Sequence, residues 1–257
     1  FEMDEALRNR EIYIALQPQL NIRSGRISSA EVLVRWIHPE MGVISPAEFV
    51  QMAERGKRID QLTQYVIQSS FQFLRDAQKI DPGFNIAVNI SPSLIGSAEF
   101  EFMLHAALRV YGVKASSIML EITENEQLLN NSGAQDAMGR LRDAGFGISI
   151  DDYGAGLSTL TYLLKVPANE VKLDRTLIST LRYNERSQLL IQSTISVAQS
   201  LGMHVVAEGV EDPDTLAILR TLECNLAQGY FIGQPVGAEE ILSILESSSS
   251  VQAVAQA

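Results

Sequence analysis

Short apolar segments alternate with amphipathic segments along almost the whole chain. The apolar segments are rich in Val and Ile, which is typical of strands that are buried on both faces. They lie at residues 11–18, 27–36, 84–90, 118–123, 147–151, 170–173, 204–208 and 226–232. This pattern predicts a series of short strands separated by helices.

The segments between these strands carry helical signals. Apolar residues keep helical spacing through residues 60–79, and Leu190, Thr194, Val197 and Leu201 form a second stripe of this kind. Residues 45–48 read Ser-Pro-Ala-Glu, a capping box with proline at the first helical position, so we expect a helix to begin there. Helix ends are expected at Gly112, Gly145 and Gly202.

Strands that alternate with helices over 257 residues predict an α/β fold, a closed TIM-type (β/α)8 barrel. A doubly wound open sheet is the alternative. No GxGxxG or GxxxxGK[ST] loop follows any of the expected strands, which counts against the nucleotide-binding versions of that sheet. Composition does not change in mid-chain, so we expect one domain over residues 1–245 and a flexible tail over 246–257.

Charge and cysteine content limit the function classes. Lys and Arg number 20 against 31 Asp and Glu, which gives a net charge of -11 and argues against a partner that is a nucleic-acid polymer. The single cysteine, Cys224, excludes an internal disulfide and a multi-cysteine metal site. No apolar run approaches the roughly 20 residues that span a bilayer. We therefore expect a cytoplasmic domain without membrane contact of its own, alone or as the cytoplasmic portion of a membrane-attached chain.

Polar residues end most of the expected strands. In a barrel, the residues at the carboxyl ends of the strands converge on one mouth, whereas the strand middles fill the core. The polar residues at or near these ends are Gln17, Glu31, Asn89, Glu121, Asp151 with Asp152, Lys172 with Asp174, Glu208 and Gln228.

Several carboxylates at one mouth favour a metal site. Like charges a few ångströms apart raise one another's pKa unless cations neutralise them. The donors are oxygens rather than His or Cys, so Mg²⁺ or Mn²⁺ is expected in preference to Zn²⁺. The adjacent Asp151 and Asp152 are suited to bridging two ions, an arrangement that serves phosphate-ester hydrolysis. Lys172 would then lie in a positive field that lowers its pKa and lets it position or deprotonate a water.

Each of these residues also has a structural interpretation. Asp151 and Asp152 fit a turn in which one aspartate caps the next helix, and Lys172 fits an ion pair with Asp174. A lone glutamate after a strand is usually a surface charge. The repetition of such residues at strand after strand favours the functional interpretation.

The chain resembles the EAL-domain family, phosphodiesterases that hydrolyse the bacterial second messenger cyclic di-GMP. The resemblance runs from about Glu11 to Leu242. Nine motifs carry it in order: LQPQ (16–19), AEVLVRW (30–36), HPEMGVISPAEF (38–49), VNISP (88–92), LEITE (120–124), DDYGAG (151–156), VKLD (171–174), VAEGVE (206–211) and AQGY (227–230). One motif alone is a weak signal, whereas nine in the same order are specific.

The resemblance implies a fold and a role for each matching residue. The barrel would be a modified one whose first strand runs antiparallel to the others. The implied metal ligands are Glu31, Asn89, Glu121 and Asp151 for one ion, and Asp151, Asp152 and Glu208 for the second. The implied catalytic residues are Lys172, Glu31 and Gln228, and the implied dinucleotide contacts are Gln17, Leu33, Arg35, Asp174 and Tyr230. Glu124 and Glu211 match carboxylates that support the loop after the aspartate pair, a loop tied to dimerisation in the family.

The implied reaction opens one phosphodiester link of cyclic di-GMP and gives linear pGpG. It would require two Mg²⁺ or Mn²⁺ ions, with Ca²⁺ inhibitory. The resemblance also implies a homodimer and an upstream sensor or GGDEF domain in a larger signalling protein. The alternative is an inactive cyclic di-GMP receptor that signals by conformation, but the sequence retains Lys172, Asp151 and Glu208. A module that neither binds nor cleaves the dinucleotide is the third class, and Gln17, Arg35 and Asn89 argue against it.

The chain departs from the family pattern at three places. Val32 stands where the naming motif has alanine, but its side chain should point away from the face that carries Glu31. The loop DDYGAGLSTL differs from the usual DDFGTGYSSL at Tyr153, Ala155, Leu157 and Thr159, which affects regulation through the loop more than the metals. Gln234 stands where arginine is common.

Overall fold

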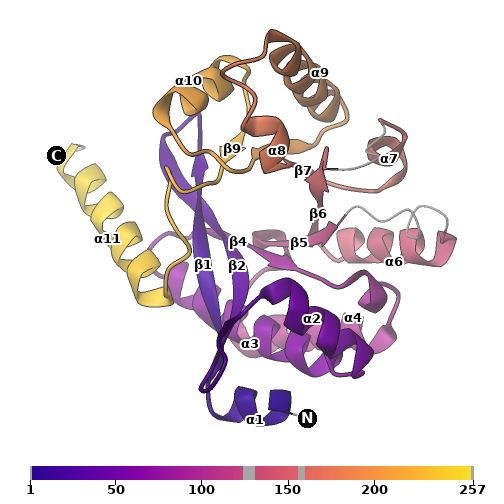
Figure 1. Cartoon of the computed structure of the whole chain (residues 1–257). Helices are drawn as coiled ribbons and strands as arrows, with labels where there is room; N and C mark the ends of the chain where they lie inside the picture. The colour runs from indigo at the N-terminus through magenta and orange to yellow at the C-terminus, as the bar shows by residue number, and fades with distance from the viewer. Residues whose placement is uncertain (1, 124–130, 156–159, 256–257) are drawn as a thin grey trace.

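The computed structural model of the chain describes residues 2–123, 131–155 and 160–255, and Figure 1 shows the arrangement of its elements. The strands are β1 (Ile12–Asn21), β2 (Arg26–His38), β3 (Gly42–Ile44), β4 (Asn85–Asn89), β5 (Ile118–Thr123), β6 (Gly147–Tyr153), β7 (Glu170–Leu173), β8 (His204–Ala207) and β9 (Leu226–Ala227). The helices are α1 (Glu2–Arg8), α2 (Pro46–Arg55), α3 (Ile59–Ala77), α4 (Ala98–Tyr111), α6 (Ser132–Asp143), α7 (Leu160–Lys165), α8 (Arg175–Ile178), α9 (Glu185–Ser200), α10 (Pro213–Thr221) and α11 (Ala238–Ala255), with 3₁₀ turns η1 (Pro92–Leu94) and η2 (Ala115–Ser117).

The strands close into a barrel in the order β1-β9-β8-β7-β6-β5-β4-β2, and the pairing of β2 with β1 completes the ring. Neighbouring strands from β2 to β9 are parallel, whereas β1 is antiparallel to both β2 and β9. The short β3 lies outside the ring, where it pairs with the end of β2. The predicted modified barrel with an antiparallel first strand is therefore confirmed, and the open-sheet alternative is wrong.

The main hydrophobic core includes the outward side chains of the strands and the inner faces of the helices. Val32 of β2 belongs to this core with 2% of its surface exposed, together with Phe71 and Leu74 of α3. Because successive strand residues point to opposite faces, Glu31 is left to face the barrel interior. The prediction that Val32 points away from the face carrying Glu31 is confirmed. No helix in the described ranges is both long and apolar enough to cross a membrane.

Two details of the helices differ from the sequence expectation. Helix α2 begins at Pro46 as expected, but the Ser45 side chain makes no capping hydrogen bond, so the predicted capping box is not formed. The buried face of α9 consists of Ile191, Thr194, Ile195 and Ala198, so that only Thr194 of the predicted stripe is buried. Leu190 is 54% exposed because this face is rotated by about one position toward Ile191.

The C-terminal third of the chain contains a further difference, in the length of its last strand. Strand β9 covers only Leu226–Ala227, because the chain turns at Gly229, where φ is +156°. A Cβ atom there would lie 2.2 Å from the backbone nitrogen of Val210, which leaves room only for glycine. Helix α11 continues to Ala255, and the flexibility expected of residues 246–257 stays a prediction.

Candidate active site

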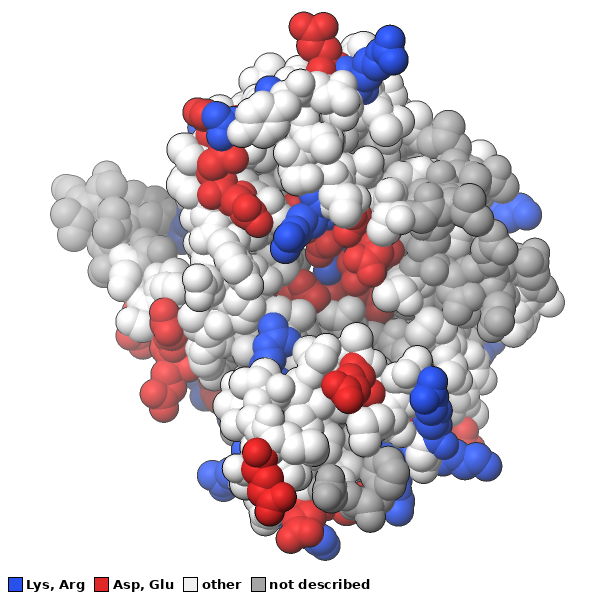
Figure 2. Space-filling model, in the orientation of Figure 1, with Lys and Arg blue, Asp and Glu red and all other residues white. Residues whose placement is uncertain are grey.

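The mouth of the barrel gathers the polar residues that the sequence places at strand ends. Glu31 lies on β2, Glu121 on β5, Asp151 on β6 and Lys172 on β7, and Glu208 directly follows β8. Figure 2 shows acidic side chains inside the hollow at the centre of one face of the molecule, with basic side chains around it. The fold therefore brings these groups together at one mouth, as the sequence predicts.

Lys172 is the centre of this cluster. Its Nζ lies 2.9 Å from Asp151 Oδ1, 2.9 Å from Glu208 Oε1, 3.0 Å from Glu121 Oε1 and 3.4 Å from Glu31 Oε2. The side chain is 1% exposed, so these charges interact in a medium of low dielectric. The alternative pairing of Lys172 with Asp174 is wrong, since the ammonium group is directed at four other carboxylates.

Amide groups hold both oxygens of Glu31. Asn89 Nδ2 donates to Glu31 Oε1 over 2.7 Å, and Gln228 Nε2 donates to Glu31 Oε2 over 2.5 Å. Burial would raise the pKa of Glu31, but Lys172 and these two donors outweigh it and hold the pKa below its ordinary value. Glu31 is therefore kept as an oriented carboxylate.

Burial pushes three other carboxylates of the mouth, Glu121, Glu208 and Asp152, toward their protonated form. Burial, followed by repulsion from Glu31, raises the pKa of Glu121 well above its ordinary value. Burial also raises the pKa of Glu208 to about 7, and burial with the neighbouring Asp151 raises the pKa of Asp152. Although burial alone would lower the pKa of Lys172, the surrounding carboxylates, Glu121 first, raise it well above its ordinary value.

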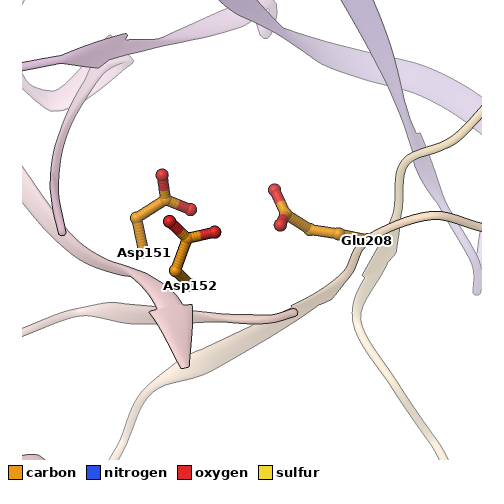
Figure 3. Close-up of side chains that lie close together, drawn as sticks. All are labelled: Asp151, Asp152 and Glu208. Carbon is orange, nitrogen blue, oxygen red and sulfur yellow. The ribbon is translucent and has the colours of Figure 1, made fainter. Parts of the chain in front are cut away.

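The oxygen atoms of this mouth fit a divalent cation. Glu121 Oε1 and Asp151 Oδ1 are buried with Lys172 Nζ as their ion-pair partner, and Glu121 Oε2 is buried without a hydrogen-bond donor among the described residues. Asp151, Asp152 and Glu208 present oxygens that lie within 4.8 Å of one another, and Figure 3 shows Glu208 directed toward the two aspartates. A mouth in which several buried carboxylates share one ammonium group is suited to a hard cation.

A local irregularity in β6 gives the aspartate pair its geometry. Successive residues of a regular strand point to opposite faces, so Asp151 and Asp152 would not normally share one site. The pairing of β6 with β7 shifts register between Ile150 and Tyr153, and Asp152 has a φ of +56°. A left-handed backbone at a non-glycine residue costs of order 1–3 kcal/mol. This strain turns both carboxylates toward Glu208.

The residues expected to contact the dinucleotide lie around the same region with different exposure. Gln17 is buried and donates to the Gly233 carbonyl oxygen over 3.2 Å, whereas Leu33 and Arg35 are half-buried on β2. Arg35 Nη1 donates to the carbonyl oxygen of Val34 over 2.9 Å. Tyr230 is 66% exposed.

Two other expected residues, Asp174 and Glu211, lie in the described part of the chain, and a third does not. Asp174 is the N-cap of α8 and accepts a hydrogen bond from the backbone N–H of Thr176. Glu211 is exposed, and Glu124 lies outside the described residues. Leu157 and Thr159 of the divergent loop lie outside them as well, so their part in regulation stays a prediction.

Two residues of the site escaped the sequence analysis. Gln19 Nε2 donates to Gln228 Oε1 over 2.9 Å, and Ser29 Oγ donates to Gln19 Oε1 over 2.7 Å. Both side chains are buried inside the barrel. The available signal was the spacing of Gln17 and Gln19, which places them on the same face of a strand.

Comparisons with known proteins agree with this geometry. The sequence profile described as "EAL domain" matches residues 2–235. The chain is 36% identical to the cyclic di-GMP phosphodiesterase NbdA of Pseudomonas aeruginosa, over 91% of this chain and 30% of that protein. It is 33% identical to the cyclic di-GMP phosphodiesterase RocR of the same organism, over 94% of this chain and 62% of that protein. The chain thus spans less than two thirds of the length of these relatives.

Solved structures give the same result. The MucR phosphodiesterase in complex with cyclic di-GMP superimposes with a TM-score of 0.86 at 31% identity, over 93% of this chain and 98% of that one. The cGMP-bound EAL enzyme Bd1971 has a TM-score of 0.88 at 28% identity, over 95% of this chain and 68% of that one. By sequence profile, relatives and fold, the chain belongs to the EAL domain family.

Proposed function

We propose that this domain hydrolyses cyclic di-GMP to linear pGpG with two divalent cations, Mg²⁺ or Mn²⁺. The observation that carries the proposal is the cluster of Lys172 with Glu31, Glu121, Asp151 and Glu208 at one mouth of the barrel. The activity named for the relatives NbdA and RocR supports the choice of substrate. A domain that only binds the dinucleotide would not need this complete set.

Two groups of residues would hold the cations. Glu31, Asn89, Glu121 and Asp151 are the proposed ligands of one ion, and Asp151, Asp152 and Glu208 those of the other. When bound, such cations polarise the phosphoryl oxygens and lower the pKa of a water that attacks phosphorus. Ca²⁺ is expected to inhibit because it accepts looser coordination.

The protein's own groups prepare this site. We assign to Lys172 the orientation of the attacking water, since its ammonium group is the one buried cation that the described residues place among the carboxylates. Gln228 keeps Glu31 oriented and deprotonated through the short hydrogen bond to Oε2. Gln17, Leu33, Arg35, Asp174 and Tyr230 are the proposed contacts of the dinucleotide.

Regulation is proposed along the lines of the family resemblance. Glu211, with Glu124, would support the loop after the aspartate pair, and that loop would couple the site to a homodimer. An upstream sensor or GGDEF domain would supply the input in a larger cytoplasmic signalling protein. The measured sedimentation of the chain with and without cyclic di-GMP tests the dimer.

Turnover tests the proposed activity. The purified chain is incubated with cyclic di-GMP and Mn²⁺ or Mg²⁺, with a chelator control, and the nucleotides are separated by chromatography. We expect pGpG only when a cation is present. Lys172→Ala and Asp151→Asn should lower the rate at least about 100-fold, whereas the surface controls Lys165→Ala and Asp143→Asn should leave it unchanged.

A measurement of cyclic di-GMP binding distinguishes the proposed enzyme from the main alternative, an inactive receptor. If the wild-type chain binds cyclic di-GMP but leaves it intact with both cations, the domain is a receptor and the proposed hydrolysis is wrong. Undiminished cleavage by Lys172→Ala would contradict the role assigned to Lys172 while leaving the activity itself in place.

A further inference from the structure

We infer that Gln19 and Ser29 are positioning residues, which hold the Gln228 amide with its NH₂ group toward Glu31 through one chain of hydrogen bonds. The inference deepens the proposed function and rests on it, because Glu31 is a proposed metal ligand. We call this chain of four side chains, Ser29, Gln19, Gln228 and Glu31, the amide relay.

The relay runs in one direction through the barrel interior. Ser29 Oγ donates to Gln19 Oε1 over 2.7 Å, Gln19 Nε2 to Gln228 Oε1 over 2.9 Å, and Gln228 Nε2 to Glu31 Oε2 over 2.5 Å. These four side chains are between 2% and 7% exposed. Every donor therefore points toward the carboxylate of Glu31.

Two fixed acceptors determine this direction. An ionised carboxylate can only accept, so Gln228 must turn its NH₂ group to Glu31 and its Oε1 away from it. A backbone carbonyl also only accepts, so Gln17 turns its NH₂ to Gly233, which leaves Gln17 Oε1 to accept from Gln228 Nε2 over 3.1 Å. The acceptor Gln228 Oε1 then requires a donor, and Gln19 supplies it.

The antiparallel first strand makes the relay possible. In the pairing of β1 with β2, Gln17 lies opposite Glu31 and Gln19 lies opposite Ser29. Cross-strand partners have neighbouring side chains on the same face, so both pairs project into the barrel. Gln228 follows β9, the other neighbour of β1, and so reaches both glutamines.

The far end of the relay lies at the floor of the barrel. Gln19 and Ser29 line a cavity of about 1460 Å³, whose other lining residues include Met119 of β5 and Glu170 of β7. The relay thus connects the floor cavity to the mouth that holds the proposed metal ligands.

Loss of the Gln19 amide would leave Gln228 Oε1 buried without its donor. The Gln228 side chain could then rotate, and Glu31 Oε2 would lose an oriented hydrogen bond while Oε1 keeps the one from Asn89. Loss of a residue that orients a metal ligand typically lowers metal affinity or activity about 10- to 100-fold.

A double-mutant cycle tests the relay. We measure the Mn²⁺ affinity by calorimetry, with kcat and KM for cyclic di-GMP, in Gln19→Met, Gln228→Met and the double variant. Gln19→Met should lower Mn²⁺ affinity about 10-fold, and the double variant should be no weaker than Gln228→Met. The control Met119→Leu repacks the same floor cavity outside the relay and should change the affinity less than about 2-fold. Losses that simply add would contradict the inference.

An NMR measurement that needs neither metal nor turnover tests the amide relay independently of the proposed function. The side-chain amide NMR signal of Gln228 is assigned by its loss in Gln228→Met. It should shift or broaden in Gln19→Met and stay in place in Met119→Leu. If Gln19→Met does not fold, Gln19→Leu serves instead, because leucine has no group that can donate to Gln228 Oε1.

The outcomes distinguish the two proposals. An unmoved Gln228 signal in a folded Gln19 variant overturns the relay whatever the activity is. A wild-type chain that leaves cyclic di-GMP intact contradicts the proposed function. The amide relay is still tested in that case by the NMR signal of Gln228 and by the Mn²⁺ affinity.

Discussion

The ammonium group of Lys172 stabilises the metal-free fold by neutralising buried carboxylates, and Lys172→Met is the variant that tests this. Methionine keeps most of the length and volume of the side chain and removes only its charge and its donors. Four carboxylates would then lose a cation that lies between 2.9 and 3.4 Å from their oxygens.

The magnitude follows from the burial of the cluster. Removing one partner of a buried ion pair costs about 3–5 kcal/mol because a buried charge is left uncompensated. Protonation of the carboxylates can relieve part of this cost. The pKa of Glu208 is about 7 although Lys172 lowers it, so without Lys172 it rises further, and this relief is more complete at pH 6 than at pH 8. We therefore expect a loss of about 3–5 kcal/mol in the free energy of unfolding at pH 8 with chelator, and a smaller loss at pH 6.

Urea unfolding followed by circular dichroism measures this loss. Mn²⁺ should reduce the difference between variant and wild type, since a bound cation replaces the missing charge. The control Lys165→Met changes an exposed lysine on α7 and should cost less than about 0.5 kcal/mol. A Lys172→Met protein as stable as wild type in chelator at pH 8 would refute the reasoning.

Three further predictions concern pH, the core and a turn. Burial raises the pKa of both Glu170 and Glu208 from 4.5 to about 7, so the folded metal-free chain binds their protons more tightly than the unfolded chain. The free energy of unfolding of the metal-free chain should therefore fall, by up to about 3 kcal/mol per group, as the pH rises between these two pKa values. Urea titrations with chelator measure this dependence, and a flat or rising profile would contradict the pKa shifts. Val32→Ala should lower the free energy of unfolding by about 2 kcal/mol, measured by thermal unfolding, and leave kcat/KM unchanged, because Val32 lies in the outer core. A changed kcat/KM would show that Val32 also affects the candidate active site. Gly229→Ala should cost at least about 2 kcal/mol, since its Cβ would meet the Val210 backbone at 2.2 Å, and a wild-type melting temperature would be incompatible with this turn.

The fold could be predicted from the sequence because strand periodicity and chain order determine a barrel. The predicted strand over 118–123 coincides with β5, and that over 170–173 coincides with β7. The shorter β9 depends on a close approach between Gly229 and Val210, which no local pattern reveals. The buried face of α9 was misjudged because Leu190 and Ile191 are both apolar, and only packing decides which one points inward.

The charged part of the site was easier to predict than its neutral part. Asp151, Lys172 and Glu208 stand out at strand ends because charges are rarely buried without a reason. Gln19 and Ser29 are neutral residues inside strands, and their role depends on the antiparallel register between β1 and β2. The bulge that turns Asp152 toward Glu208 is likewise a property of the folded backbone.

Hydrolysis in isotopically labelled water tests the central claim most directly. The wild-type chain is incubated with cyclic di-GMP and Mn²⁺ in water enriched in ¹⁸O, and the products are analysed by mass spectrometry. We predict pGpG with one ¹⁸O atom on its terminal phosphate, absent with chelator and in Lys172→Ala. Intact cyclic di-GMP with both Mn²⁺ and Mg²⁺ would contradict the assignment of this mouth as a phosphodiesterase site.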